Sequence, residues 1–117
     1  MLMKYRSKIA KLAVCLFLSA LSGSAAAGWT VAKISSIVVY EDGDVVYVFP
    51  EGGVKDAPAC HGSNGDYLSF SLKRRYAREY YAGMLAAYTA GKTVRFRGLD
   101  ACKDQSMSET LMYFELM

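Results

Sequence analysis

The sequence is poor in the residues that much protein-site chemistry requires. Its 117 residues include one histidine, three cysteines and two prolines. A Ser-His or Cys-His nucleophile needs a histidine base, and no HExxH, Gly-x-Ser-x-Gly or paired-carboxylate motif is present. We therefore expect no catalytic residue, no metal site and no cofactor. The few prolines and ten glycines exclude a collagen-like chain, and 53% hydrophobic residues against 21% charged ones exclude a disordered chain.

Positive charge is concentrated at the N-terminus. Four of the fourteen Lys and Arg residues lie there without an acidic neighbour: Lys4, Arg6, Lys8 and Lys11. From residue 28 onward, the remaining ten face eleven acidic residues, which leaves a charge of −1. The overall charge of +3 therefore does not indicate a nucleic-acid-binding protein.

The first 27 residues have the parts of a secretory signal peptide. The cations precede an apolar run over residues 12–21, which is too short to cross a bilayer core of about 30 Å. Small residues fill positions 22–27, and we expect cleavage between Ala27 and Gly28. The alternative is an uncleaved membrane anchor. Cys15 lies inside the apolar run, where it cannot mark a lipoprotein cleavage point, so we expect a secreted or periplasmic protein.

Removal of the signal leaves one domain, residues 28–117, without a transmembrane segment and with two cysteines, Cys60 and Cys102. An even count in an oxidising compartment predicts a disulfide, which would stabilise the fold by about 4 kcal/mol. Metal ligation by Cys60 and the adjacent His61 is the alternative, although these residues are too few for a closed zinc site.

Hydrophobic periodicity predicts five strands and one helix. The alternating segments cover residues 29–40, 45–49, 67–72, 93–97 and 107–117. Residues 73–90 follow a helical period, and Gly91 suits the left-handed residue that ends a helix. Long loops over residues 51–65 and 99–106 contain the two cysteines.

The same periodicity assigns faces to these elements. Leu68, Phe70 and Leu72 are expected to face the core, with Ser69 and Ser71 toward water. One half of the helix is expected to pack inward: Tyr76, Ala77, Tyr80, Tyr81, Met84, Leu85, Ala87 and Tyr88. In the last strand, one face is expected to carry Met112, Phe114 and Leu116.

The element order predicts a mostly β fold with one helix. The order β-β-β-α-β-β is that of the OB-fold, a five-stranded Greek-key barrel in which a helix closes one end. Closure removes the hydrophobic sheet edges that five strands would otherwise leave exposed. An open α+β sheet with the helix on one face is the alternative.

Two segments resemble a known family. Residues 80–96, YYAGMLAAYTAGKTVRF, are similar to the helix, glycine turn and fourth strand of the B subunits of subtilase cytotoxin and typhoid toxin, which are bacterial toxins of the AB5 type. Residues 34–39, ISSIVV, resemble the first strand of that family. The resemblance implies an OB-fold subunit that forms a homopentamer, binds sialylated glycans and assembles with a toxin A subunit. Small exported proteins of unknown function share this pattern.

The resemblance and the tyrosine content together suggest a ligand site. Ser35 matches the serine with which the family binds the sialic acid carboxylate, whereas Ser36 replaces a family glycine. Tyrosine rings can serve as platforms for sugars, and Tyr47 and Tyr67 are the strand tyrosines expected at the surface. The expected ligand-binding residues are Ser35, Lys33, Tyr47 and Tyr67. The alternatives are an ordinary exposed serine and tyrosines that pack in the core.

Two features of the helical segment remain. One is a basic cluster near the helix start: Lys73, Arg74, Arg75 and Arg78. It predicts an anion site, which Arg95 and Arg97 could extend, and the alternative is a first turn exposed to solvent. The outward face of the helix carries small residues, over which another helix could approach closely. This predicts an oligomer interface formed by Ala82, Gly83, Ala86 and Arg75. The alternative is that alanine is there as the best helix former.

These observations favour an exported binding protein. We expect a glycan-binding, B-subunit-like module of a toxin or adhesin, which binds sialylated glycoproteins or glycolipids. The alternative is a stand-alone periplasmic binding or inhibitor module. A third hypothesis, an enzyme, would have to depend on His61. No nucleic-acid partner is expected.

Overall fold

The computed structural model describes residues 28–117 and confirms a mostly β chain with one helix in the order β-β-β-α-β-β. The expected signal peptide lies outside the described residues. The elements are β1 (Trp29–Tyr40), β2 (Val45–Pro50), β3 (Leu68–Ser71), α1 (Ala77–Ala90), β4 (Thr93–Gly98) and β5 (Leu111–Leu116). The helix begins later than residue 73 and ends as expected, because Gly91 adopts the left-handed conformation with φ of 63°. No described helix is long and apolar enough to cross a membrane.

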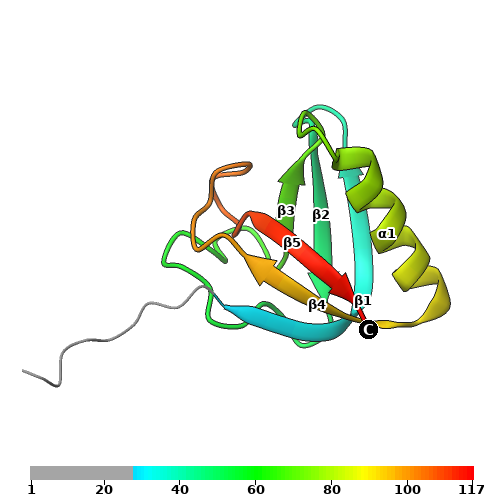
Figure 1. The fold of residues 1–117 in the computed structure, drawn as a ribbon. Helices are drawn as coiled ribbons and strands as arrows, with labels where there is room; N and C mark the ends of the chain where they lie inside the picture. Colours follow the sequence, from blue (N-terminus) through cyan, green and yellow to red (C-terminus); the bar gives the residue numbers. More distant parts are fainter. Residues whose placement is uncertain (1–27) are drawn as a thin grey trace, which may run out of the picture.

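The long first strand bends and pairs with two partners. Its first half, from Trp29 to Lys33, pairs with β4, and its second half pairs with β2. The register shifts between Ile34 and Ser36, so Ser35 is the extra residue of a β-bulge. In Figure 1, β1 accordingly runs along the lower edge of the molecule and then turns upward beside the helix.

The five strands form one antiparallel sheet in the order β3-β2-β1-β4-β5. This order differs from the continuous closed order that we expected for a Greek-key barrel. The edge strands β3 and β5 approach each other at a single parallel bridge between Ser69 and Thr110. Closure stops there because β5 begins only at Leu111, four residues later than the sequence predicts.

The core lies between the curved sheet and α1, which packs mainly against β1 (Figure 1). Its centre is formed by fully buried side chains: Val46, Val48, Phe70, Met84, Val94, Phe96 and Leu111. The inward half of the helix is narrower than predicted. Tyr76, Leu85 and Tyr88 are exposed, since a helix lying over one strand buries only a narrow stripe of its surface.

Two predicted strand faces also need correction. Ser69 is fully buried, because residues 108–110 contact it: its Oγ lies 2.6 Å from Ser108 Oγ, and its N–H donates to the Glu109 carbonyl. Leu72 lies beyond the end of β3 and is partly exposed. In β5, Phe114 is partly buried, but Met112 and Leu116 are exposed, because the sheet ends at this strand.

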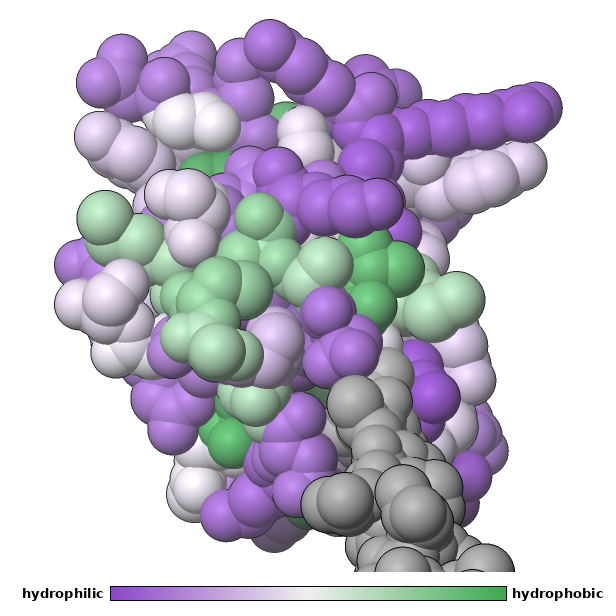
Figure 2. Space-filling model, turned by 90° about the vertical axis from the view of Figure 1, so that its left-hand side faces the viewer, coloured by the Kyte–Doolittle hydropathy of each residue, from purple (hydrophilic) through white to green (hydrophobic). Residues whose placement is uncertain are grey.

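The disulfide between Cys60 and Cys102 is confirmed, with a Cα–Cα distance of 6.2 Å. It joins the loop before β3 to the loop before β5, and it excludes Cys60 as a metal ligand. Figure 2 shows the side of the molecule that carries these loops, where weakly hydrophobic residues form a band between hydrophilic ones. The bond therefore fixes two segments that have little regular secondary structure.

Candidate functional site

One outer surface of the sheet combines aromatic rings with cations. The alternation of β1 and β4 turns Val94 and Phe96 inward and leaves their neighbours outward. Pairing of β1, β4 and β5 then brings six outward side chains together. We call this surface the Trp29 face: Trp29, Val31, Lys33, Arg95, Arg97 and Tyr113.

Trp29 is the centre of this face and is 40% exposed. The guanidinium carbons of Arg97 and Arg95 lie 4.6 and 5.5 Å from its ring centre, and Tyr113 meets it edge-on at 5.7 Å. Arg95 also forms a 3.4 Å ion pair with Glu115. The face therefore presents an indole ring beside an excess of positive charge.

The two predicted ligand residues of β1 lie close together, but only one of them has its donor groups free for a ligand. Lys33 is exposed and belongs to the Trp29 face. Ser35 is also exposed, at the bulge, and its Oγ donates a hydrogen bond of 2.9 Å to the carbonyl oxygen of Phe49. Because a hydroxyl has one hydrogen, Ser35 cannot donate to a ligand carboxylate while this bond is intact.

Tyr67 is not at the surface as predicted. It is only 2% exposed, and its hydroxyl accepts hydrogen bonds from Gln105 and Asn64. Its ring stacks on that of Tyr47 at 4.3 Å. Burial raises the pKa of Tyr47, and the neighbouring Tyr67 hydroxyl adds to the rise. The loop before β5 thus makes Tyr67 a packing residue, and Tyr47 is partly covered as well.

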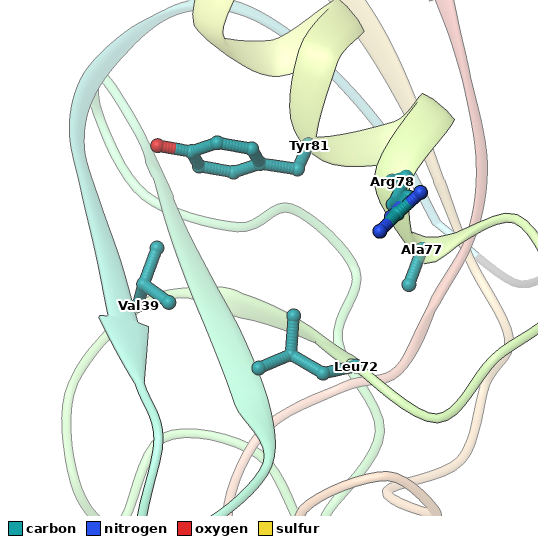
Figure 3. A pocket seen from close by; sticks show the side chains of 5 residues that line it. All are labelled: Val39, Leu72, Ala77, Arg78 and Tyr81. Carbon is teal, nitrogen blue, oxygen red and sulfur yellow. The ribbon is translucent and has the colours of Figure 1, made fainter.

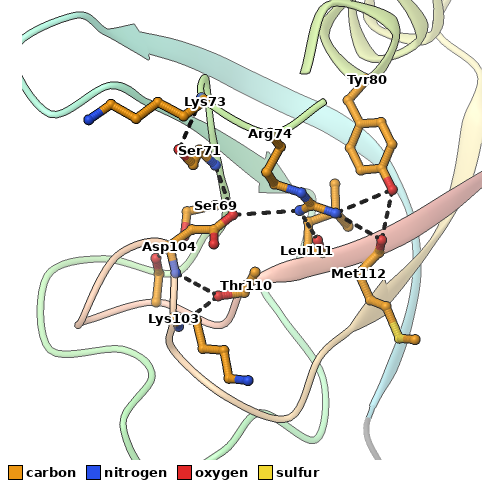
Figure 4. A network of polar contacts seen from close by, with 11 residues as sticks. Ser69, Ser71, Lys73, Arg74, Tyr80, Lys103, Asp104, Thr110, Leu111 and Met112 are labelled. Carbon is orange, nitrogen blue, oxygen red and sulfur yellow. Dashed lines mark hydrogen bonds and ion pairs between the residues drawn. The ribbon is translucent and has the colours of Figure 1, made fainter. Parts of the chain in front are cut away.

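The predicted basic cluster has separate partners in the structure. Lys73 pairs with Asp44 at 3.3 Å, and Arg75 lies over the ring of Tyr76. Arg74 enters the polar network of Figure 4, where it pairs with Asp104 and donates to the carbonyl oxygens of Leu111 and Met112. Arg78 lines a pocket between α1 and the end of β1.

The predicted oligomer residues do not form one free strip. Ala82 and Ala86 are exposed on α1, and Arg75 is exposed before the helix begins. Gly83 instead lies against the core, because a Cβ at this position would come within 2.6 Å of Phe114 Cζ. Gly83 is therefore a site of close packing between α1 and β5.

His61 links the two loops that the disulfide joins. Its Nδ1 accepts the N–H of Glu109 at 2.8 Å, and its Nε2–H faces Asp66 Oδ1 at 3.0 Å. Burial raises the pKa of Asp66, but the hydrogen bonds from His61 and from the Val54 N–H outweigh this effect and lower it. Both ring nitrogens are occupied, so His61 acts here as a structural connector. Among residues 28–117, no group of three His, Cys, Asp or Glu residues is arranged to hold a metal.

Sequence reasoning missed Trp29 and Tyr113 as members of a site. The alternation of residues 29–33 and 93–97 places their odd-numbered side chains outward, which was a usable signal. It could not show that β1 and β4 are neighbours, and only this pairing brings Trp29 beside Arg97. No protein-family model, curated protein or solved structure matches this chain.

Proposed function

We propose that the protein is an exported binding module whose Trp29 face binds an acidic sugar of a glycan. The observation that carries this proposal is the half-open indole ring of Trp29 with guanidinium groups at 4.6 and 5.5 Å. Sugars pack their C–H faces on aromatic rings, and a guanidinium pairs with a carboxylate. Sialic acid has both an apolar C–H face and a carboxylate, and it is the sugar implied by the resemblance to toxin B subunits.

The charges on the Trp29 face support an anionic ligand. Lys33, Arg95 and Arg97 bring three positive charges to it, whereas Glu115 pairs with Arg95 and Glu109 interacts electrostatically with Arg97. The Arg95–Glu115 pair is solvent-accessible, and such pairs contribute little to stability. A ligand carboxylate can therefore exchange with Glu115 at small cost.

We also propose an OB-type barrel and a toxin or adhesin setting. The bridge between Ser69 and Thr110 and the 3.1 Å bond from Ser69 N–H to the Glu109 carbonyl draw the sheet edges together. Export rests on the sequence of residues 1–27 and is consistent with the disulfide. Assembly into a homopentamer with an A subunit rests on the resemblance. A stand-alone periplasmic module, without enzyme activity, is the second candidate.

Glycan binding is tested with the exported protein on an array of sialylated glycans and their desialylated counterparts. Trp29→Ala is expected to weaken binding to the sialylated glycans about tenfold or more. Tyr88→Ala, which removes a similarly exposed ring from the helix, is the matched control and should bind normally. Absence of a preference for sialylated glycans, or equal losses in the two variants, contradicts the proposal.

Assembly is tested separately by sedimentation of the native protein. A ring predicts a mass several times that of one chain, and Ala82→Arg or Ala86→Arg should lower it without unfolding the protein. A monomer at tens of micromolar favours the stand-alone module instead.

A further inference from the structure

A pocket opens where the helix begins, at the opposite end of β1 from the Trp29 face. It has a volume of about 540 Å³ and is lined by Val39, Leu72, Ala77, Arg78 and Tyr81. Figure 3 shows the side chains of Val39 and Leu72 pointing toward the ring of Tyr81, which lies across from them. The pocket therefore lies between the end of β1, the residue after β3 and the first turns of α1.

The walls of this pocket are core surface that the helix does not cover. Val39 pairs with Val46, which is fully buried, and so belongs to the inner face of β1. Val39 itself is nevertheless 52% exposed, and Leu72 is 36% exposed. Because α1 begins only at Ala77, nothing among the described residues covers this end of the core.

Two polar groups of the pocket have no partner within residues 28–117. The side chains of Arg78 and Tyr81 form no hydrogen bond, ion pair or ring contact with any described residue. The Tyr81 hydroxyl points across the pocket toward β1 (Figure 3). The three cations before the helix, Lys73, Arg74 and Arg75, all have a partner. Arg78 thus leaves one uncompensated positive charge at an apolar pocket.

We propose that this pocket binds an amphipathic carboxylate, that is, a single-chain molecule with an apolar body and one carboxylate group. The apolar chain would lie against Val39, Leu72 and the Tyr81 ring, and burying these exposed surfaces favours binding. The carboxylate would accept hydrogen bonds from the Arg78 guanidinium and the Tyr81 hydroxyl. The start of α1, where Tyr76 provides no side-chain cap, adds a favourable positive potential. The pocket volume is in the range of small-molecule sites.

The test titrates decanoate, below the concentration at which it forms micelles, into the native protein labelled with ¹⁵N. Amide shifts are expected at residues 39, 72 and 77–81, with decanol binding about tenfold more weakly and a decyl ammonium ion hardly at all. Arg78→Gln should weaken decanoate binding about tenfold, whereas Arg75→Gln, its neighbour outside the pocket, should not change it. Val39→Asp should abolish binding.

Three outcomes overturn the proposal: no saturable shifts, shifts centred elsewhere, or equal binding of decanoate and decanol with no effect of Arg78→Gln. Thermal unfolding of each variant checks that the fold is retained. The result is independent of glycan recognition, since Trp29→Ala should still bind decanoate, and Arg78→Gln should still bind the glycan.

Discussion

At the scale of single residues, Arg74 connects the chain before the helix to the last strand. Its guanidinium donates to the carbonyl oxygens of Leu111 and Met112, pairs with Asp104 at 3.6 Å and lies 4.8 Å from the ring centre of Tyr80 (Figure 4). Strand β5 is at the sheet edge, so these bonds supplement those it makes with β4. Arg74 therefore has a structural role that its neighbours in the sequence do not share.

Arg74→Ala is expected to lower the free energy of unfolding by about 1.5 to 3 kcal/mol, because it removes the charged donor to the Leu111 carbonyl. It also leaves the Met112 carbonyl with the Tyr80 hydroxyl alone and Asp104 with the Ser71 N–H alone. Urea denaturation followed by circular dichroism measures the loss. Arg75→Ala is the matched control and should change the stability by less than about 0.5 kcal/mol. Similar losses in both variants would contradict the role assigned to Arg74.

Glu109 is a second residue with a measurable signature. It is only 1% exposed, its Oε2 accepts the Asp100 N–H, and its Oε1 has no partner among the described residues. Burial raises the pKa of this carboxyl above its ordinary value of 4.5, and the hydrogen bond from Asp100 only partly opposes the rise. The folded protein thus holds this proton more tightly than the unfolded chain does.

The sign of the pH dependence follows from that difference. Well below pH 4.5 this carboxyl is protonated in both the folded and the unfolded state. As the pH rises through 4.5 the unfolded chain ionises first, so this carboxyl lowers the stability progressively until it ionises in the folded state too. Glu109→Gln should remove this decline, so its stability relative to the wild type should increase above pH 4.5. Urea midpoints of the wild type and Glu109→Gln from pH 4 to 8 measure this change. A difference in stability between the two proteins that does not change with pH would contradict the prediction. The pKa of Asp66 is lowered instead, so Asp66 stabilises the fold while it is ionised. This stabilisation is lost only at lower pH, where Asp66 becomes protonated.

At the scale of elements, the contact between α1 and β5 depends on a missing side chain. Gly83 lets the ring of Phe114 approach the helix, and the same ring meets Tyr80 edge-on at 5.4 Å. Gly83→Leu is expected to destabilise the protein by about 1 to 3 kcal/mol, because the ring must move from this packing. Ala86→Leu, on the exposed side of the same helix, should cost little. Thermal unfolding of both variants tests the difference, and a neutral Gly83→Leu would contradict it.

The elements themselves were largely predictable from the sequence. Alternation identified the five strands, and the glycine at position 91 marked the helix end, because these signals depend only on local geometry. The covering of Ser69 by Ser108 was not predictable, since a loop distant in the sequence makes that contact. The Trp29 face was missed for the same reason: alternation shows which residues point outward, but not which strands are neighbours.

At the scale of the whole molecule, the disulfide is the main covalent constraint. It closes a segment with a sequence separation of 42, which corresponds to about 4 kcal/mol of stabilisation in the chain-entropy description. The double variant Cys60→Ala/Cys102→Ala should be less stable by about that amount. Reductant should lower the stability of the native protein to a similar level and leave the variant unchanged. A native protein that is indifferent to reductant would contradict this prediction.

The same disulfide determines whether a proteolytic cut separates the chain into two pieces. Strand β3, helix α1 and β4 lie inside the closed segment, whereas β1 and β2 lie outside it. A tryptic cut after Lys92, in the exposed turn between α1 and β4, therefore releases no fragment, and the nicked protein migrates as one species until reductant separates its two pieces. A cut in the turn between β1 and β2 separates the polypeptide at once in denaturant, with or without reductant. Gels run with and without reductant therefore tell these two cuts apart.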